Sequence, residues 1–298
     1  MSTGTVRTVA IGDGILDVIE RDGSPTTRHA GGAALNLAVG LARLGAASSL
    51  IANVGHDPAG FWLREYLRES RVRLVETPTV DFTGVATSIR INGEPRYTFT
   101  APMHRRRINF TDETHSEIAG ADAVVVNSFP LDNAAQTELL ARSFAASGGL
   151  RVVDPNPRPA IVADPGAFRV GFETLVPHSD LVKISDEDAD LLYGEPVDVV
   201  AARILSLGAG AVLVTRGSDG ASYLSANGER IDAAIAQLPG PIVDTLGAGD
   251  ASLATMVHGL LQSAAGELDV ARVLDRSMRV AAATCRTAGG LLQDPDRA

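Results

Sequence analysis

The chain has 298 residues, 45% of them hydrophobic and 21% charged, which is enough to bury a sizeable globular core. Its net charge of −10 argues against nucleic-acid binding, which needs a basic surface, and no apolar run approaches the roughly 18 residues of a membrane helix. The one cysteine, Cys285, excludes an intramolecular disulfide and agrees with a cytoplasmic location. We therefore expect neither a nucleic-acid nor a membrane partner.

The first predicted elements are a buried strand over residues 6–11 and a turn at residues 12–14. Residues 12–17 do not complete the pattern G-x-G-x-x-G, because Asp17 occupies the last position, so a dinucleotide-binding turn is disfavoured. Lys183 is the only lysine of the chain and does not follow a glycine, which excludes a P-loop. Any ATP must be bound by another route.

A glycine pair precedes the first predicted helix, which ends before Gly45. Gly31 and Gly32 allow a ligand to approach the backbone closely. Asn36 offers both a hydrogen-bond donor and an acceptor, which suits a polyol. A glycine-assisted helix start without a ligand explains the same residues.

The next segment predicts a strand at 49–55 and a helix that begins at Asp57 and Pro58. Residues 83–100 then alternate in polarity around Asn92-Gly93, a type I′ turn signal, which predicts a β-hairpin. Arg105–Arg107 follow the hairpin. These three arginines either hold the phosphate of a sugar phosphate or form a solvated loop or interface.

The middle of the chain predicts a strand at 123–126, a helix at 132–147 and a strand at 151–153. The last strand leads into Asp154-Pro-Asn-Pro-Arg158. Open α/β sheets bind ligands at the carboxyl ends of parallel strands, so Asn156 and Arg158 are candidate ligand contacts. A proline-rich loop without a ligand is the alternative.

Residues 180–188 predict a strand that runs into a helix, with Ser185 and Asp188 at the spacing of a capping box. Lys183 lies in that strand, and its ammonium group either belongs to a binding site or forms a salt bridge. A strand at 211–215 and a hairpin around Asn227-Gly228 follow.

Residues 243–252 open a helix with an apolar face at helical spacing. Gly247, Ala248 and Gly249 are small enough for an anion to reach their N–H groups at the helix N-terminus. Asp250 is placed beside that site, where it could take a proton from an attacking hydroxyl. The alternative is a purely structural role, in which Asp250 complements the helix dipole and the glycines form a tight turn.

Five motifs resemble, in order, those of the ribokinase-like (PfkB) sugar kinases, and most closely those of the fructokinase-like branch. They are G-G-x-x-x-N at 31–36, V-G-x-D-x-x-G at 54–60, D-P-N-x-R at 154–158, T-x-G-x-x-G at 215–220 and D-T-x-G-A-G-D at 244–250. Ser252 departs from the family pattern, which has Phe there. The resemblance, with strands and helices alternating along residues 6–290, implies one α/β domain over residues 1–298. That domain is a Rossmann-type three-layer sandwich with a mostly parallel sheet and a small β-sheet lid near residues 15–30 and 84–101.

The resemblance also implies a role for each matching residue. The catalytic base would be Asp250, with an anion hole at Gly247, Ala248 and Gly249. The sugar contacts would be Asp17, Gly31, Gly32, Asn36, Asn156 and Arg158. The ATP contacts would be Lys183, Ser185, Thr215, Gly217 and Gly220, with Asp188 reaching Mg²⁺ through water.

The implied activity is transfer of the ATP γ-phosphoryl group to a hydroxyl of a small sugar, with fructose as the first candidate. Ribose, 2-keto-3-deoxygluconate, phosphofructose and nucleosides stay open as acceptors, as do activation by K⁺ and a homodimer through the lid. Two rivals come from other classes. A non-catalytic sugar or nucleotide sensor is disfavoured by the intact Asp250, and a nicotinamide-dependent dehydrogenase by the incomplete first turn.

Overall fold

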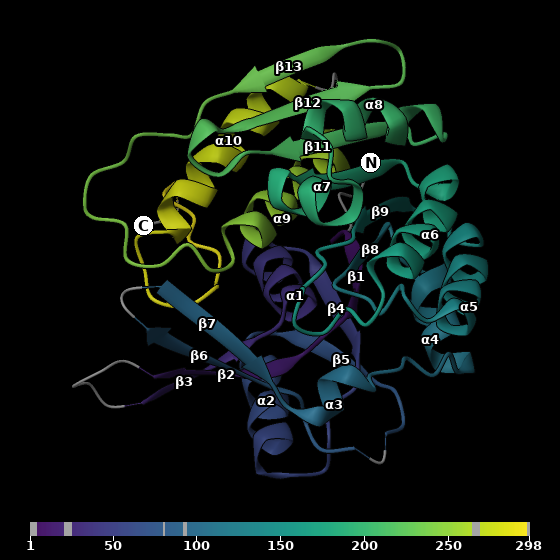
Figure 1. Ribbon diagram of the computed structural model, residues 1–298, viewed down its shortest axis with the longest axis vertical. Coiled ribbons are helices and arrows are strands. Elements are labelled where there is room, and N and C mark those ends of the chain that lie inside the picture. The colour runs from purple at the N-terminus through teal and green to yellow at the C-terminus, as the bar shows by residue number, and fades with distance from the viewer. Residues whose placement is uncertain (1–4, 21–25, 80, 92–93, 264–268, 297–298) are drawn as a thin grey trace.

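The computed structural model describes residues 5–20, 26–79, 81–91, 94–263 and 269–296, which form a large and a small β-sheet (Figure 1). The strand order of the large sheet is β13-β12-β11-β10-β9-β8-β1-β4-β5. Its strands are β1 Arg7–Gly12, β4 Ala47–Ala52, β5 Val72–Glu76, β8 Ala123–Asn127, β9 Leu150–Asp154, β10 Leu181–Ser185, β11 Ala211–Thr215, β12 Ala221–Ser225 and β13 Arg230–Ala233.

Neighbouring strands from β5 to β11 run parallel, and β11, β12 and β13 pair antiparallel. Central strands are apolar on both sides: Val125 faces one hydrophobic cluster, while Val124 and Val126 face the other. A parallel sheet buried on both faces requires this pattern. The register sets Asn127 beside both Gly12 and Asp154, so polar residues from separate segments meet at the carboxyl edge.

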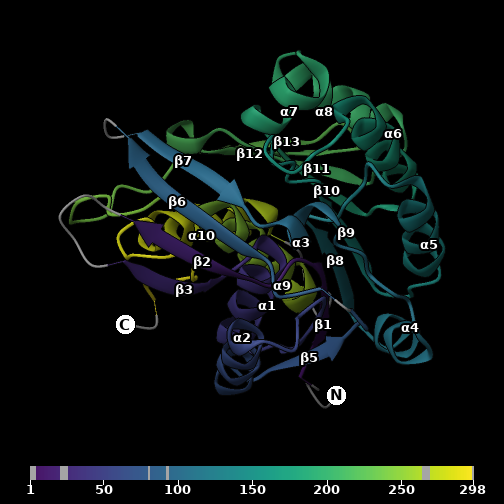
Figure 2. The same cartoon turned by 60° about the horizontal axis from the view of Figure 1, so that its bottom comes forward.

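Helices cover both faces of the large sheet, which confirms the predicted three-layer fold (Figures 1 and 2). One face carries α1 Ala33–Leu44, α2 Pro58–Glu69, α9 Ala248–Ser263 and α10 Val270–Thr284. The other carries α4 Asp112–Ala119, α5 Ala134–Ala145, α6 Pro165–Leu175, α7 Asp186–Tyr193 and α8 Val197–Ser206. Short helical turns are α3 Ala101–His104, η1 Val176–His178 and η2 Gly217–Asp219. None of the helices in the described ranges is long and apolar enough to span a membrane.

The small sheet has the order β3-β2-β6-β7, and Figure 2 shows it as a separate layer that projects from the large sheet. Its strands are β2 Ile15–Glu20, β3 Thr27–Gly31, β6 Val85–Ile91 and β7 Glu94–Phe99. A separate apolar cluster anchors it, in which Ile15 and Ala86 pack with Ile161 from the loop after β9. The predicted hairpin strands are therefore present, while the Asn92-Gly93 turn itself lies outside the described residues.

Two predicted boundaries shift because side-chain hydrogen bonds set where the elements begin or end. The strand expected at 49–55 stops at Ala52, and Asn53 instead donates to the carbonyl of Thr77. The helix expected from residue 132 begins at Ala134, because the Asn133 side chain caps it by accepting from the N–H of Gln136.

Candidate active site

The first turn of α9 holds Asp250, which is 8% exposed. Asn36 of α1 donates to its Oδ2 over 3.0 Å, and Asn127 at the end of β8 donates to its Oδ1 over 3.1 Å. Burial raises the pKa of the Asp250 carboxyl, while the Asn36 amide, Lys183 and the guanidinium of Arg158 act to lower it. The result is an oriented carboxylate whose basicity is increased by its surroundings.

The turn before α9 needs a glycine at position 247. Gly247 has a φ of 74°, and a Cβ there would lie 2.0 Å from the carbonyl oxygen of Gly290. The Ala248 N–H points to the Thr245 carbonyl oxygen at 3.3 Å. Position 247 thus has a structural reason to be glycine, because a side chain there would collide with the chain at residue 290. An anion hole at the Gly247 N–H stays a prediction.

Gly249, in contrast, faces a charged group. A Cβ at this position would lie 3.7 Å from the Lys183 ammonium, with no closer neighbour outside its own helix. The N-terminus of α9 thus combines the N–H groups of its first turn, a helix dipole and a lysine, which together favour an anion.

A cavity of about 340 Å³ lies beside Asp250. Its polar lining includes Asp17 of β2, Asn36 of α1 and Arg158 of the loop after β9. The small sheet contributes Ala86 and Phe99 to the apolar part of the wall. A small apolar cleft with a few convergent polar groups is the usual form of a small-ligand site. We name it the sugar cavity after the ligand that the sequence resemblance leads us to expect.

Asp17 occupies the space that Gly31 leaves free, and Gly32 faces Asp13. A Cβ on Gly31 would lie 1.8 Å from Asp17 Oδ2, and one on Gly32, whose φ is 100°, would lie 2.7 Å from the Asp13 carbonyl oxygen. Burial, followed by the nearby Asp13 carboxylate, raises the pKa of Asp17 to about 7, although Arg158 opposes this shift. Gly31 therefore makes room for the Asp17 carboxylate, which lines the cavity.

Asn156 does not line the cavity and is linked to Asp250 through Asn127. Its Nδ2 donates to Asn127 Oδ1 over 3.1 Å, and Asn127 in turn contacts Asp250. The D-P-N-x-R pattern predicts Asn156 near the sugar, and no motif singles out Asn127. The signal was present, because Asn127 directly follows the buried strand expected at residues 123–126.

Lys183 forms a buried ion cluster at the same edge of the sheet. Its Nζ lies 3.0 Å from Asp154 Oδ2 and 3.7 Å from Asp188 Oδ2. Burial acts to lower the pKa of Lys183, but the two carboxylates outweigh it and raise the pKa above its usual range. The lone lysine is thus a salt-bridged residue that also lies beside α9.

Ser185 and Asp188 form the capping box at the start of α7. Ser185 Oγ accepts from the Asp188 N–H over 3.1 Å, and Asp188 Oδ2 accepts from the Ser185 N–H over 2.9 Å. The helix cap therefore occupies both side chains. Thr215 lies beside Ser185 in the parallel register, and Gly217 has open space around it. Gly220 instead serves its turn, because a Cβ there would lie 2.1 Å from the Ala233 carbonyl oxygen.

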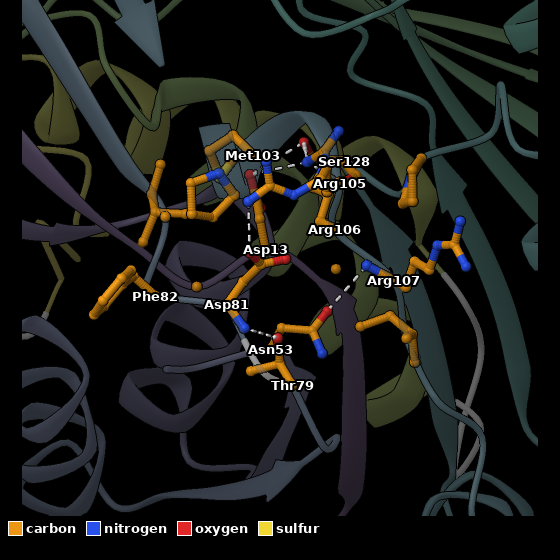
Figure 3. Close-up of a pocket in the computed structure, with 17 residues that line it drawn as sticks. Asp13, Asn53, Thr79, Asp81, Phe82, Met103, Arg105, Arg106, Arg107 and Ser128 are labelled. Carbon is orange, nitrogen blue, oxygen red and sulfur yellow. Dashed lines mark hydrogen bonds and ion pairs between the residues drawn. The ribbon is translucent and has the colours of Figure 1, made fainter. Parts of the chain in front are cut away.

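A second pocket adjoins the sugar cavity, and Asp13 and Ser128 belong to the walls of both (Figure 3). Arg105 donates to Asp81 over 2.6 Å, and Arg106 donates to the Ser128 carbonyl over 2.9 Å.

Figure 3 shows the Arg107 side chain directed away from the other labelled residues, with only its backbone N–H on Asn53. Of the two readings of Arg105–Arg107, the structural one fits better than a phosphate clamp, because the guanidinium groups do not converge.

Metal ligands are sparse in this region. Within the part of the chain that the structure describes, no group of three or more His, Cys, Asp or Glu side chains is arranged to hold a metal ion. A dedicated all-protein metal cage is therefore absent from these residues.

A buried carboxylate at a helix N-terminus, beside a cavity under the small sheet of an α/β fold, is the arrangement that transfer of a group to a bound hydroxyl requires. The family model described as pfkB family carbohydrate kinase matches residues 8–297. The chain belongs to this family and is a sugar kinase.

Individual relatives are distant but cover nearly the whole chain. Fructokinase of Escherichia coli is 26% identical over 96% of this chain and 95% of its own. ATP-dependent 6-phosphofructokinase of Thermoanaerobacterium thermosaccharolyticum is 26% identical over 97% of this chain and 90% of its own. The crystal structure of an uncharacterized sugar kinase from Pyrococcus horikoshii in complex with ATP has a TM-score of 0.80 at 25% identity. The match covers 98% of this chain and 97% of that chain.

Proposed function

We propose that this kinase transfers the γ-phosphoryl group of ATP to a hydroxyl group of fructose. One observation carries the proposal: Asp250 borders the sugar cavity and at the same time lies in the first turn of α9. A hydroxyl in the cavity and a phosphoryl group at the helix N-terminus would then meet at the carboxylate.

The proposed step moves one proton and one phosphoryl group. The sugar oxygen forms a bond to the γ-phosphorus while the bond from that phosphorus to the bridging oxygen of ADP breaks. Asp250 accepts the hydroxyl proton. The N–H groups at the start of α9 stabilise the negative charge on the transferred group, and a positioned general base contributes roughly 10²–10⁴-fold.

Fructose is favoured by the composition of the cavity and by the relatives. Asp17, Asn36 and Arg158 offer acceptors and donors for hydroxyl groups. A sugar phosphate would need several converging cations, whereas Arg105 and Arg106 are engaged by Asp81 and Ser128, which leaves Arg158 as the cation in the cavity lining. The resemblance to a 6-phosphofructokinase keeps fructose 6-phosphate as the second candidate acceptor.

ATP is supported by the ATP-bound structure of the Pyrococcus relative. We place its phosphates between the start of α9 and the adjacent carboxyl ends of β10 and β11, near Lys183, Thr215 and Gly217. Mg²⁺, when bound to the nucleotide, neutralises phosphate charge, and it typically takes one or two protein carboxylates. Asp188 is committed to the α7 cap, so we assign it at most a water-mediated contact.

The test is ATP-to-ADP turnover over a panel of acceptors with Mg²⁺, with and without K⁺. The panel contains fructose, ribose, 2-keto-3-deoxygluconate, adenosine and fructose 6-phosphate, and phosphorus NMR identifies the product. We expect fructose to be phosphorylated with the highest kcat/KM. Preference for fructose 6-phosphate would replace the proposed acceptor, and nucleotide binding without turnover of any sugar would favour a sensor.

A further inference from the structure

Asn127 is a fully buried amide, 0% exposed, and both ends of its side chain are occupied. Its Nδ2 donates to Asp250 Oδ1 over 3.1 Å, and its Oδ1 accepts from Asn156 Nδ2 over 3.1 Å. Because an ionised carboxylate only accepts hydrogen bonds, the nitrogen end of the Asn127 amide must face Asp250, which leaves its oxygen end for Asn156. The amide therefore has one defined orientation.

The backbone around this chain of amides is held in an unusual conformation. Asn156 has a φ of 40°, and Ser128, which directly follows Asn127, has a φ of 54°. Non-glycine residues rarely adopt the left-handed region, and such residues cluster at functional sites where the surrounding structure fixes them. Both lie just beyond the carboxyl ends of the neighbouring strands β8 and β9. The two strained residues therefore lie in the segments that connect to Asp250, since Asn127 bonds to the carboxylate and Asn156 bonds to Asn127.

We propose that Asn127 is a positioning residue for phosphoryl transfer: held by Asn156, it orients the Asp250 carboxylate and keeps it ionised and ready to accept a proton. Asn36 performs the matching task on the other carboxylate oxygen. The inference rests on the proposed function, because it assumes that Asp250 is the base. Asn127 itself does not line the sugar cavity, and in our proposal it contacts Asp250 and not the substrate.

The surroundings of Asp250 explain why such support is needed. Burial raises its pKa, and the hydrogen bonds from Asn36 and Asn127 act to lower it. The charged groups around it oppose one another: the cations are Lys183 of β10 and Arg158 after β9, and the carboxylates are Asp17 of β2 and Asp154 of β9. Removing a donor from the charged form should therefore raise the pKa of Asp250.

The first test needs no substrate. Aspartate labelled with ¹³C at the side-chain carboxyl is incorporated, Asp250→Asn identifies the Asp250 signal, and its titration is followed by NMR in the wild-type chain and in Asn127→Ala. We expect the midpoint to rise by about one pH unit in Asn127→Ala. An unchanged midpoint in a folded Asn127→Ala variant would overturn the proposal.

The matched control is Asn53→Ala. Asn53 is likewise an amide just past the end of a central strand, and it bonds to Thr77 and Arg107 but not to Asp250. Its loss should leave the Asp250 midpoint unchanged. If Asn127→Ala does not fold, Asn127→Ser keeps a small polar side chain that cannot bridge Asn156 and Asp250, and we expect the same direction of shift.

The second test uses the pH profile of turnover with the acceptor that the panel identifies. In Asn127→Ala the acidic limb of kcat/KM should move to higher pH, and kcat at neutral pH should fall about 10-fold or more while KM for the sugar changes little. A loss of activity with an unmoved acidic limb would mean a merely structural role. Should no sugar be turned over even by the wild-type chain, the proposed function fails, and the NMR titration still decides the role of Asn127.

Discussion

At the scale of single residues, Asp17 shows how function and stability oppose each other in the sugar cavity. Burial and the neighbouring Asp13 raise its pKa to about 7, so the fold disfavours its ionised form. A carboxyl whose pKa is higher in the folded chain stabilises the fold fully at low pH. This contribution is lost as the pH rises through the folded value. The carboxylate is therefore retained at a cost, as expected of a group that serves a ligand.

We predict that Asp17→Asn stabilises the chain more at pH 8 than at pH 5, because the raised pKa of Asp17 costs stability only where the carboxyl must ionise. The difference between the two pH values should be about 2 kcal/mol in the free energy of unfolding relative to wild type. Urea unfolding at both values measures it, with the exposed Asp275→Asn on α10 as a control for charge. The same variant should raise the KM for the sugar. An equal effect of Asp17→Asn at pH 5 and pH 8 would show that the folded chain does not raise the pKa of Asp17.

At the scale of elements, α7 illustrates how a motif can be read in two ways. The spacing of Ser185 and Asp188 fits both a capping box and a nucleotide or metal contact, and the structure forms the capping box with both reciprocal hydrogen bonds. The helix N-terminus would otherwise leave these backbone N–H groups unpaired. The geometry thus accounts for the two residues without a ligand.

We predict that Ser185→Ala lowers the free energy of unfolding by about 1 kcal/mol and leaves ADP affinity unchanged. Urea unfolding and calorimetric titration with Mg²⁺ and ADP measure the two quantities. Thr111→Ala is the matched control, because Thr111 forms the same kind of cap on α4, away from the sugar cavity. If Ser185→Ala instead weakens ADP binding while stability is preserved, Ser185 contacts the nucleotide.

At the scale of the whole molecule, the strand order determines the site. The register brings Gly12, Asn127 and Asp154 level at the carboxyl edge of the large sheet, although they come from three separate segments. Ligands bind at this edge in open α/β sheets. The small sheet closes over it with Ala86 and Phe99. Excluding water from the transfer site is the physical reason for such a cover, and dimerisation through it stays a prediction.

Much of this arrangement could be predicted from the sequence, since local patterns encode it. Buried strands alternate with helices, and Asp250, Asn36 and Arg158 were all expected at a site that the structure does assemble. Contacts across the fold could not be predicted. Gly247 is required by the carbonyl of Gly290, and Asn127 is positioned by Asn156, and neither relation leaves a local signature.

The central claim is that Asp250 is the base of a sugar-phosphorylating reaction. The most direct measurement is single-turnover phosphorylation of the best acceptor by Asp250→Asn, with Asp275→Asn as a control that removes the same charge from an exposed position. The amide cannot take a proton, so we predict a rate lower by about 10²–10⁴-fold, with ATP affinity retained and the control unaffected. A folded Asp250→Asn variant that phosphorylates the sugar at the wild-type rate would contradict the account.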